Sequence, residues 1–404
     1  MAVGTKRGAA VSVAMAVSGT VRVLSFQTLT DECESAPRWS SSVDEARGEV
    51  MTTNNTVAVY GAYGHTGRFV VAELLERGFV PVLAGRDEKK LRALAEERPG
   101  LDVRPASVGD PESLDRALAG AAAVVNSAGP FATTAAPLIE AALRAGIPYV
   151  DVAAEIEANV DTFAHFADRA RAAGVVVVPA MAFFGGLGDL LVTAAIGDWA
   201  TADEAHIAYG LSSWHPTEGT RAAGKVSGER RDGRRVRYAK GQLEYHDDAL
   251  PTVEWSFPEP MGTRAVLGEF TMADVVTVPS HLSVPEVTTY MTTDAAGDLS
   301  APRTPAPTAV DGTGRSAQTF LVDVVVRSGE EERRAVARGQ DIYAVTAPLA
   351  VEAVSRILAG RTRTVGVASA GGIFDAADFL RALSAHLSFE LRDRGASSRP
   401  QASR

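Results

Sequence analysis

Three glycines near the start of the patterned sequence have the spacing of a phosphate-binding turn. Gly61 lies near the end of the apolar run TVAVYGA, Gly64 follows that run, and Gly67 opens the helix-like run GRFVVAELLERG. Glycine allows a tight turn and a close approach of backbone to ligand, and the amide groups of a helix N-terminus attract phosphate. Because the pattern stands inside a series of strand-helix units, we favour a dinucleotide site over the alternative interpretation of a merely tight turn. The intervening residues expected at this site are Tyr63, His65 and Thr66.

An arginine ends the second predicted strand, where a fold that binds NAD more often has an acidic residue for the ribose hydroxyls. Arg86, in the segment AGRDEKK, can hold a 2'-phosphate in a forked, charge-assisted contact. Lys89 and Lys90 add positive charge nearby, although a solvated helix start explains these lysines better. Asp87 is an alternative ligand for the ribose. Together with the GxxGxxG spacing, which is common in reductases that prefer NADP, Arg86 predicts NADP(H) as the cofactor.

Small residues end the fourth predicted strand, in the segment VVNSAGPF. Because ligands of open α/β folds bind at the carboxyl edge of the sheet, these residues are expected to flank the ribose and the nicotinamide. A turn that starts the next helix is the alternative, and the two roles are compatible. The residues concerned are Ser127, Ala128, Gly129 and Pro130.

Hydride transfer depends mainly on the cofactor, so the protein has to position the acceptor and supply a proton donor or an oxyanion stabiliser. Asp151 and Glu155 follow the fifth strand and form one candidate acid or substrate-orienting pair, with helix capping as the alternative for Asp151. His215, in SWHPT, and Tyr343, in GQDIYAVT, are alternative proton donors, and an exposed turn is the other interpretation of His215. Asp341 is expected to orient Tyr343 or to cap the next helix.

Other charged residues give weaker indications. Arg221 and Lys225 could hold an anionic group of a substrate, and a solvated basic loop that continues to Arg235 is the alternative. The seven histidines are scattered, and no spacing of histidine and carboxylate suggests zinc or iron, so no metal is predicted. The single cysteine, Cys33, excludes intramolecular disulfides and thiolate clusters.

From Thr56 the chain alternates apolar strand-like runs with helix-like runs, as far as VVVVPAMA. Six apolar runs separated by helices predict a parallel sheet covered on both faces, because parallel strands need crossover connections and have two buried sides. After about residue 190, longer β-type segments such as EAHIAYGL and QTFLVDVVVRS predict a second, antiparallel or mixed sheet. The turn-rich segment 293–314 is expected to be an exposed connection, and helical spacing returns in TAPLAVEAVSRILAG.

The predicted fold class is therefore α/β, with a Rossmann doubly wound parallel sheet and a second α+β domain. Met51 stands directly before the first strong strand, so the polar, aperiodic sequence upstream is expected to be an extension, with Met51 as a candidate start. The expected parts are a disordered extension over 1–50, an NADP-binding Rossmann domain over 51–190, a sheet-rich substrate and dimerisation domain over 191–342, helices returning to the first domain over 343–390, and a disordered tail over 391–404.

The composition is that of an ordinary globular protein, with 46% hydrophobic and 22% charged residues among 404. A formal net charge of -10 argues against general affinity for nucleic acid, because phosphate binding uses clustered Lys and Arg. No run reaches the ~20 apolar residues that span a bilayer, so no membrane insertion is predicted. A cytoplasmic location is expected, and the lone cysteine fits a reducing compartment.

The chain resembles the saccharopine dehydrogenase-like NADP-binding family, which includes trans-acting enoyl reductases. The segments that carry the resemblance are GAYGHTGR, AGRDEKKL, VVNSAGPF, AALRAGIPYVDVAAE and GVVVVPAMAFFGGLGDLL. It covers residues 56–195 well and the rest, to about 390, more loosely. The resemblance implies a sheet domain that closes over the nicotinamide, a final helix that returns to the first domain, a substrate cleft between the domains and, by analogy, a homodimer.

Members of this family differ in reaction, so the resemblance implies fold and cofactor but not substrate. The expected function is NADPH-dependent reduction of an enoyl, imine or carbonyl group of a small or carrier-bound metabolite. One alternative is oxidation of an amino or hydroxy acid by NADP+, and another is a non-catalytic regulator that binds NADP. Saccharopine itself is a poor candidate, because the sequence has no obvious basic cluster for an amino-dicarboxylate.

Overall fold

The computed structural model describes residues 54–394, and its first sheet has seven parallel strands. Their order, β15-β6-β5-β4-β1-β2-β3, runs outward from β1 in both directions, as in a doubly wound fold. The strands are β1 (Thr56–Tyr60), β2 (Val80–Gly85), β3 (Asp102–Pro105), β4 (Ala123–Asn126), β5 (Tyr149–Asp151), β6 (Val176–Val178) and β15 (Gly366–Val367). The expected extension over 1–50, the candidate start Met51 and residues 395–404 of the expected tail lie outside the described residues.

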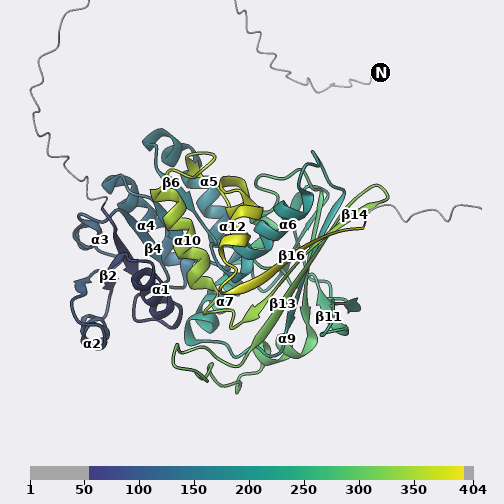
Figure 1. The fold of residues 1–404 in the computed structure, drawn as a ribbon, viewed down its shortest axis with the longest axis horizontal. Helices are drawn as coiled ribbons and strands as arrows, with labels where there is room; N and C mark the ends of the chain where they lie inside the picture. The colour runs from purple at the N-terminus through teal and green to yellow at the C-terminus, as the bar shows by residue number, and fades with distance from the viewer. Residues whose placement is uncertain (1–53, 395–404) are drawn as a thin grey trace, which may run out of the picture. The chain divides into compact units, whose positions relative to one another are not determined.

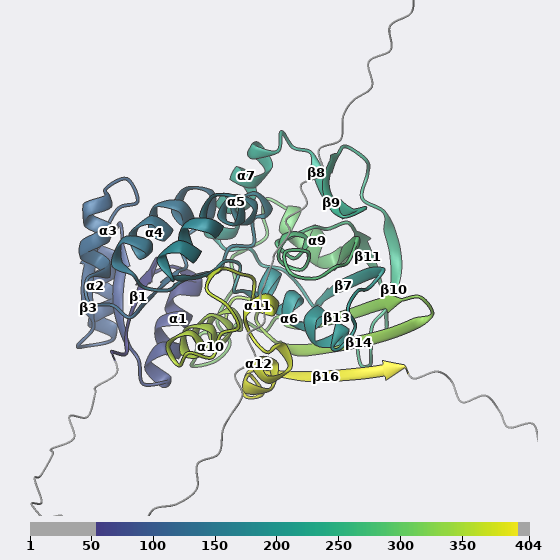
Figure 2. The same ribbon diagram turned by 90° about the horizontal axis from the view of Figure 1, so that it is seen from above.

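Strand β1 explains why helices cover both faces of this sheet. Val57 and Val59 belong to a core shared with α1 and α2, whereas Ala58 and Tyr60 belong to a core shared with α3, α4 and α5. Because successive side chains of a strand point to opposite faces, an apolar strand has to be covered on both sides. Figure 2 shows the two layers of helices with the sheet between them. The helices are α1 (His65–Glu76), α2 (Glu88–Glu97), α3 (Pro111–Leu118), α4 (Phe131–Ala145) and α5 (Ile156–Ala173).

The second sheet has nine strands and is mixed, which confirms the predicted fold class. Its main path is β10-β11-β12-β7-β13-β14-β16, and the hairpin β8–β9 joins it at β12. Only β12 and β7 pair in parallel, and the other neighbours are antiparallel. The strands are β7 (Glu204–Leu211), β8 (Arg235–Ala239), β9 (Gln242–His246), β10 (Thr252–Ser256), β11 (Thr263–Gly268), β12 (Glu286–Thr292), β13 (Thr319–Ser328), β14 (Glu331–Gln340) and β16 (Leu387–Arg394).

Two segments expected to be loops are partly helical. The stretch around Arg221 and Lys225 forms α7 (Glu218–Arg230), whose N-terminus is capped because the Thr217 hydroxyl accepts from the Thr220 amide at 3.0 Å. The start of the expected connection 293–314 forms α9 (Thr293–Ser300), with its alanines buried against the second sheet. The other elements of this part are a π-helical turn, η1 (Phe183–Leu187), and helices α6 (Gly188–Ile196) and α8 (Asp274–Thr277).

The C-terminal segment returns to the first domain and then re-enters the second sheet. Helix α10 (Thr346–Leu358) packs on α1 (Figure 1), where the Arg77 guanidinium pairs with Glu73 at 2.6 Å and with Glu352 at 2.5 Å. Helices α11 (Ala370–Ile373) and α12 (Ala376–Ala382) follow. The expected tail from residue 391 is wrong at its start, because β16 continues to Arg394 and pairs with β14 throughout. Residues 391–394 are mostly polar, which predicted a tail, but their backbone pairs with β14 and so continues the strand.

One large apolar core connects the two sheets. It contains residues of β1 and β6 from the first sheet, β7 and β13 from the second, and α6 and α10 between them. A smaller core covers the opposite face of the second sheet, around Phe257 and Leu321. Among the described residues, the helices are all too short or too polar to pass through a bilayer.

Candidate active site

The glycine turn after β1 is packed so closely that Gly61 and Gly67 have no room for a side chain. Gly61 has φ +87, and a Cβ on it would lie 2.9 Å from the Cβ of Ala128. A Cβ on Gly67 would lie 2.2 Å from the Gly61 carbonyl oxygen and 2.8 Å from the Ser127 hydroxyl. These glycines let the first turn of α1 pack directly on the ends of β1 and β4.

The N-terminus of α1 is suited to an anionic ligand. Its N-cap residue, Gly64, provides no side-chain hydrogen bond, and the first turn has no acidic residue. The amide groups at the start of a helix have no partner within the helix and carry partial positive charge. The turn therefore fits the diphosphate of a dinucleotide, held by backbone amides around His65, Thr66 and Gly67.

The end of β2 separates the roles of Arg86 and Asp87. Arg86 is exposed and, within residues 54–394, has no hydrogen bond or ion pair, so its guanidinium is available to a ligand. The Asp87 carboxylate instead caps α2 by accepting from the Lys90 amide at 3.1 Å. Lys90 also places its ammonium 5.6 Å from the ring centre of Tyr63 in the glycine turn. Arg86 and Lys90 are thus the cations beside this end of the site.

The segment after β4 lies directly beside the glycine turn, and its predicted place beside the ribose and nicotinamide stays a prediction. The Ser127 amide and hydroxyl both donate to the Tyr60 carbonyl, at 2.9 and 3.0 Å. The buried Asn126 side chain accepts from the Ala128 amide at 3.0 Å and donates to Thr134 at 3.2 Å. Gly129 and Pro130 then lead into α4. This network fixes the backbone that borders the carboxyl edge between β1 and β4.

Asp151 is an internal anchor of this edge. It is 1% exposed, and its carboxylate accepts from the Ala153 and Ala180 amides, at 3.0 and 2.8 Å, and from the Tyr149 hydroxyl at 2.9 Å. Burial raises the pKa of Asp151 to about 6, although these hydrogen bonds oppose the rise. Asp151 does not cap α5, whose N-cap is Glu155. Its contacts join the ends of β5 and β6.

Glu155 lies at the same edge and has a strongly perturbed carboxyl group. Its Oε1 accepts from the Phe131 amide at 3.0 Å, directly after Pro130. Burial raises the pKa of Glu155 to about 7. A carboxyl group with that pKa holds a proton through much of the neutral range, which suits a general acid beside the expected nicotinamide position.

Tyr343 links the first domain to the loop that carries His215. Its hydroxyl accepts from the Trp214 indole at 3.1 Å and from the Thr217 amide at 3.3 Å, and it donates to the His215 carbonyl at 3.4 Å. Thr220 adds a fourth contact at 3.0 Å. The hydroxyl is therefore engaged with protein groups, and burial raises the pKa of Tyr343 above its ordinary value.

The ring of Tyr343 also meets the glycine turn. It lies edge-on to His65, with ring centres 5.2 Å apart. The buried Nε2 of His65 has no hydrogen-bond partner among the described residues, and burial lowers the pKa of this imidazole. Asp341 holds the turn before α10, because its Oδ1 accepts from the Tyr343 and Ala344 amides at 2.9 and 3.0 Å. Two predicted site regions, the glycine turn and the return segment, thus touch.

His215 and the residues of α7 border the same region. The His215 side chain is partly exposed and makes no hydrogen bond within residues 54–394. Helix α7 carries both Arg221 and Lys225, and both have protein partners. The Arg221 guanidinium donates to the Thr304 carbonyl at 2.9 Å, and the Lys225 ammonium lies 3.8 Å from the Glu229 carboxylate. A Cβ on Gly129 would lie 3.9 Å from Ala223, which brings α7 next to the segment after β4.

Sequence reasoning did not assign a role to η1, which follows β6 at the same edge. Phe184 of η1 stacks on Trp214, with ring centres 5.1 Å apart and planes 27° apart. Gly185 has φ +91 and interrupts the helical geometry together with Phe184. The pair of glycines in FFGGLGD is the only local signal of this kink.

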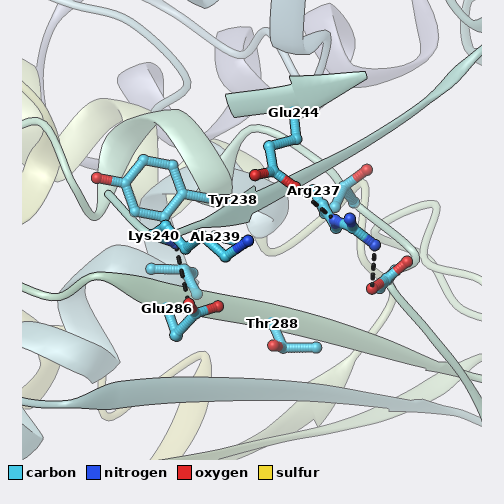
Figure 3. Close-up of a pocket in the computed structure, with 10 residues that line it drawn as sticks. Arg237, Tyr238, Ala239, Lys240, Glu244, Glu286 and Thr288 are labelled. Atoms are coloured by element: carbon cyan, nitrogen blue, oxygen red, sulfur yellow. Dashed lines mark hydrogen bonds and ion pairs between the residues drawn. The ribbon is translucent and has the colours of Figure 1, made fainter. Parts of the chain in front are cut away.

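The cavity in Figure 3 lies elsewhere, between the β8–β9 hairpin and β12, with a volume of about 270 Å³. Its carboxylates have protein partners: Glu244 pairs with Arg237 at 2.9 Å, and Glu286 accepts from the Lys240 backbone amide at 2.9 Å. None of the residues predicted at the cofactor or substrate site lines it. Across residues 54–394 no cluster of histidine, cysteine and carboxylate groups is arranged to hold a metal ion.

The fold and the site define a Rossmann domain for a dinucleotide, joined to a sheet domain at its carboxyl edge. Residues 57–178 match the family model of the saccharopine dehydrogenase NADP binding domain. The predicted resemblance is thereby confirmed for this part of the chain, and the match indicates NADP(H) as the cofactor.

Two known proteins show how far the similarity reaches. A probable mitochondrial saccharopine dehydrogenase-like oxidoreductase of Arabidopsis thaliana is 30% identical over 142 residues, which is 31% of each chain. The apo saccharopine dehydrogenase (L-Glu forming) of Saccharomyces cerevisiae matches 84% of this chain and all of its own, with a TM-score of 0.57 and 12% identity. The second likeness shows that both domains share their fold with the yeast enzyme.

Proposed function

We propose that this protein is an NADP(H)-dependent oxidoreductase that reduces an enoyl, imine or carbonyl group of a small or carrier-bound metabolite. The observation that carries the proposal is the junction of the two domains. Tyr343 connects the glycine turn to the second-domain loop 213–217, and the segment after β4 packs on the same glycine turn. Glu155 places a buried carboxyl group at that edge, bound to the Phe131 amide at 3.0 Å, and its raised pKa suits proton donation to a substrate.

The residues of this chain have separate tasks in the proposed reaction. The amides at the start of α1 bind the diphosphate, and Arg86 binds the 2'-phosphate. The bound cofactor supplies a hydride from its nicotinamide ring. Gly129 and Pro130 would border that ring, and α7 with the loop before it would exclude water from the acceptor.

Glu155 is the proton donor that we favour. Its raised pKa keeps the proton available near neutral pH, and its contact with the Phe131 amide fixes its position beside Pro130. The Tyr343 hydroxyl is held by four groups of the 214–220 segment, which favours a positioning role. His215 is the second candidate donor, because its imidazole is accessible and free of protein partners within the described residues.

Turnover of NADPH tests this proposal. The full chain is incubated with NADPH and a panel of enoyl, imine and carbonyl compounds, both free and carrier-bound, and oxidation of the cofactor is followed by absorbance. Replacing Glu155 with Gln should lower kcat by about 100-fold, within the range of general acid catalysis, and leave NADPH binding intact. Tyr343→Phe should change KM more than kcat. Equal activity of Glu155→Gln and wild type would reassign the donor, with His215→Ala as the next variant.

The alternative functions have their own outcomes in the same assay. Reduction of NADP+ by an amino or hydroxy acid, without any NADPH oxidation, would establish a dehydrogenase. Tight NADPH binding without turnover of any compound in either direction would favour the regulator. A cytoplasmic location and a homodimer stay predictions, and light scattering of the purified chain measures the second.

A further inference from the structure

The kinked turn η1 is held by side chains from distant parts of the chain. Its central residue, Gly185, has φ +91, and a Cβ there would lie 2.8 Å from the Cβ of Ala180 and 2.9 Å from that of Ala273. The Gly185 amide donates to Oδ1 of Asp274 at 3.2 Å. The Gly185 carbonyl accepts from the Thr277 hydroxyl at 3.2 Å. Both polar groups of one residue are therefore bound by the short helix α8.

This contact is built deep in the interior. Asp274 has no exposed surface, and its Oδ1 also accepts from the Tyr209 hydroxyl at 2.8 Å. A Cβ on Gly188 would lie 2.0 Å from the same Oδ1, so glycine at this position lets the carboxylate approach. Because a buried carboxylate is costly unless it is hydrogen-bonded, an arrangement that places one here has to be specific.

The kink determines where one aromatic ring lies. Phe184, directly before Gly185, has extended backbone angles, and its ring stacks on Trp214. The Trp214 indole in turn donates to the Tyr343 hydroxyl, which also accepts from the Thr217 amide. A displacement of Gly185 would move the ring on which the 213–217 loop rests, because interiors are close-packed and transmit strain.

We propose that Asp274 and Thr277 are positioning residues that set the location of the loop 213–217 at the nicotinamide edge, by fixing Gly185 and through it Phe184. They act through the loop and do not touch the reacting atoms. The inference rests on the proposed function only in that this loop faces the substrate. The contacts of Asp274 and Thr277 with Gly185 do not depend on which substrate is bound.

Hydrogen exchange of the full chain, measured by mass spectrometry, tests the proposal without any substrate. Thr277→Val removes one donor from the Gly185 carbonyl at nearly constant volume. The amides of residues 213–220 should then exchange roughly 3- to 10-fold faster, the range expected from one lost hydrogen bond. Asp274→Ala should raise exchange there further. Asp274→Asn should stay close to wild type, because it keeps an oxygen acceptor and Oδ2 has no hydrogen-bond partner among the described residues.

Thr162→Val is the matched control. Thr162 is also buried, and its hydroxyl donates to the Ala158 carbonyl at 2.9 Å, within α5. This variant should leave exchange of 213–220 unchanged. Exchange of β13 and β14 reports global stability, and NADPH affinity reports the proposed cofactor site separately. Absence of NADPH binding by wild type as well as by the variants would contradict the proposed function and leave the positioning role to be decided by the exchange of 213–220.

Two results would overturn the positioning role. One is unchanged exchange of 213–220 in folded Thr277→Val protein. The other is a rise that is equally large in β13 and β14, which would show loss of stability without any specific effect on the loop. If Asp274→Ala does not fold, Thr277→Val and Asp274→Asn decide the matter.

Discussion

The glycine turn and η1 are two strand-helix junctions at the same sheet edge, and they are held in different ways. The glycine turn is closed by hydrogen bonding and packing within its own backbone, and it also packs on Ala128 and Ser127: the Gly64 amide donates to the Gly61 carbonyl at 2.8 Å, and Gly67 packs on that same carbonyl. The turn η1 is shaped by side chains that lie 89 and 92 residues further along the chain, at Asp274 and Thr277. A locally determined turn can be recognised in a sequence, and a remotely determined one cannot.

The largest effect is expected from a methyl group in the glycine turn. Gly67→Ala places a Cβ 2.2 Å from a backbone oxygen, and no side-chain movement can relieve that contact. We expect a loss of about 3 kcal/mol or more in the free energy of unfolding, as for other overpacked cores, together with loss of NADPH binding. Denaturant unfolding and NADPH titration measure the two effects.

The control is a glycine with free space around it. Gly297 lies in α9, and a Cβ there would meet nothing within 4 Å. Gly297→Ala should stabilise the protein by roughly 0.5–1 kcal/mol, because alanine favours a helix over glycine. Equal stability of Gly67→Ala and wild type would show that the turn is looser than its contacts indicate.

The next effect is a loss of stability that depends on the Asp274 side chain beside η1. Gly188→Ala brings a Cβ to 2.0 Å from the Asp274 carboxylate and should cost about 2 kcal/mol. In an Asp274→Ala background the nearest obstructing atom is gone and only the Tyr209 hydroxyl, 2.7 Å from that Cβ, still crowds it. The same substitution should then cost at least about 1 kcal/mol less. A double-mutant cycle by denaturant unfolding gives this coupling. Additive costs would mean that the Asp274 side chain does not limit the space beside η1.

The smallest effect is a pH dependence at the same carboxylate. Burial raises the pKa of Asp274 to about 6, from 3.8 in an unfolded chain. A raised pKa means that the folded state binds the proton more tightly, so this stabilising contribution is complete below pH 3.8 and is lost as the pH rises through about 6. Between pH 7 and pH 5, wild type should gain about 1 kcal/mol relative to Asp274→Asn.

Unfolding of both proteins across this range measures the difference directly. The neighbouring titratable pair, His281 with Asp189 at 2.7 Å, is present in both proteins and cancels in the comparison. Burial would lower the pKa of His281, but the charge and hydrogen bond of Asp189 raise it overall. A constant difference between the two proteins from pH 7 to pH 5 would contradict a raised pKa at Asp274.

The sequence predicts the features that depend on local pattern. Periodicity identifies the six strands from β1 to β6, and the glycine spacing places the cofactor turn between β1 and α1. It also predicts that Ser127 and Gly61 share one edge, because parallel strands end on the same side of a sheet. NADP binding, the mixed second sheet and the family resemblance follow from the same kind of signal and are confirmed.

Features that depend on distant partners could not be predicted. Strand β15 has two residues and exists only because β6 offers an edge for pairing. The polar end of β16 is a strand because β14 pairs with it. The Tyr343 hydroxyl binds Trp214 and Thr217, which lie more than 120 residues away in the sequence. Spacing in the sequence cannot reveal these contacts, so it predicts Tyr343 as an available proton donor.

Cofactor affinity of the full chain shows whether this protein binds NADPH and whether Arg86 selects it over NADH. Calorimetric titrations with NADPH and NADH are made on wild type, on Arg86→Ala and on Arg98→Ala, which removes the same charge at the far end of α2. We expect wild type to prefer NADPH, and we expect Arg86→Ala to weaken NADPH binding by roughly 10- to 100-fold, the range for a charge-assisted hydrogen bond, without changing NADH binding. Arg98→Ala should behave as wild type. Equal binding of both cofactors by wild type, or no binding of either, would contradict this expectation.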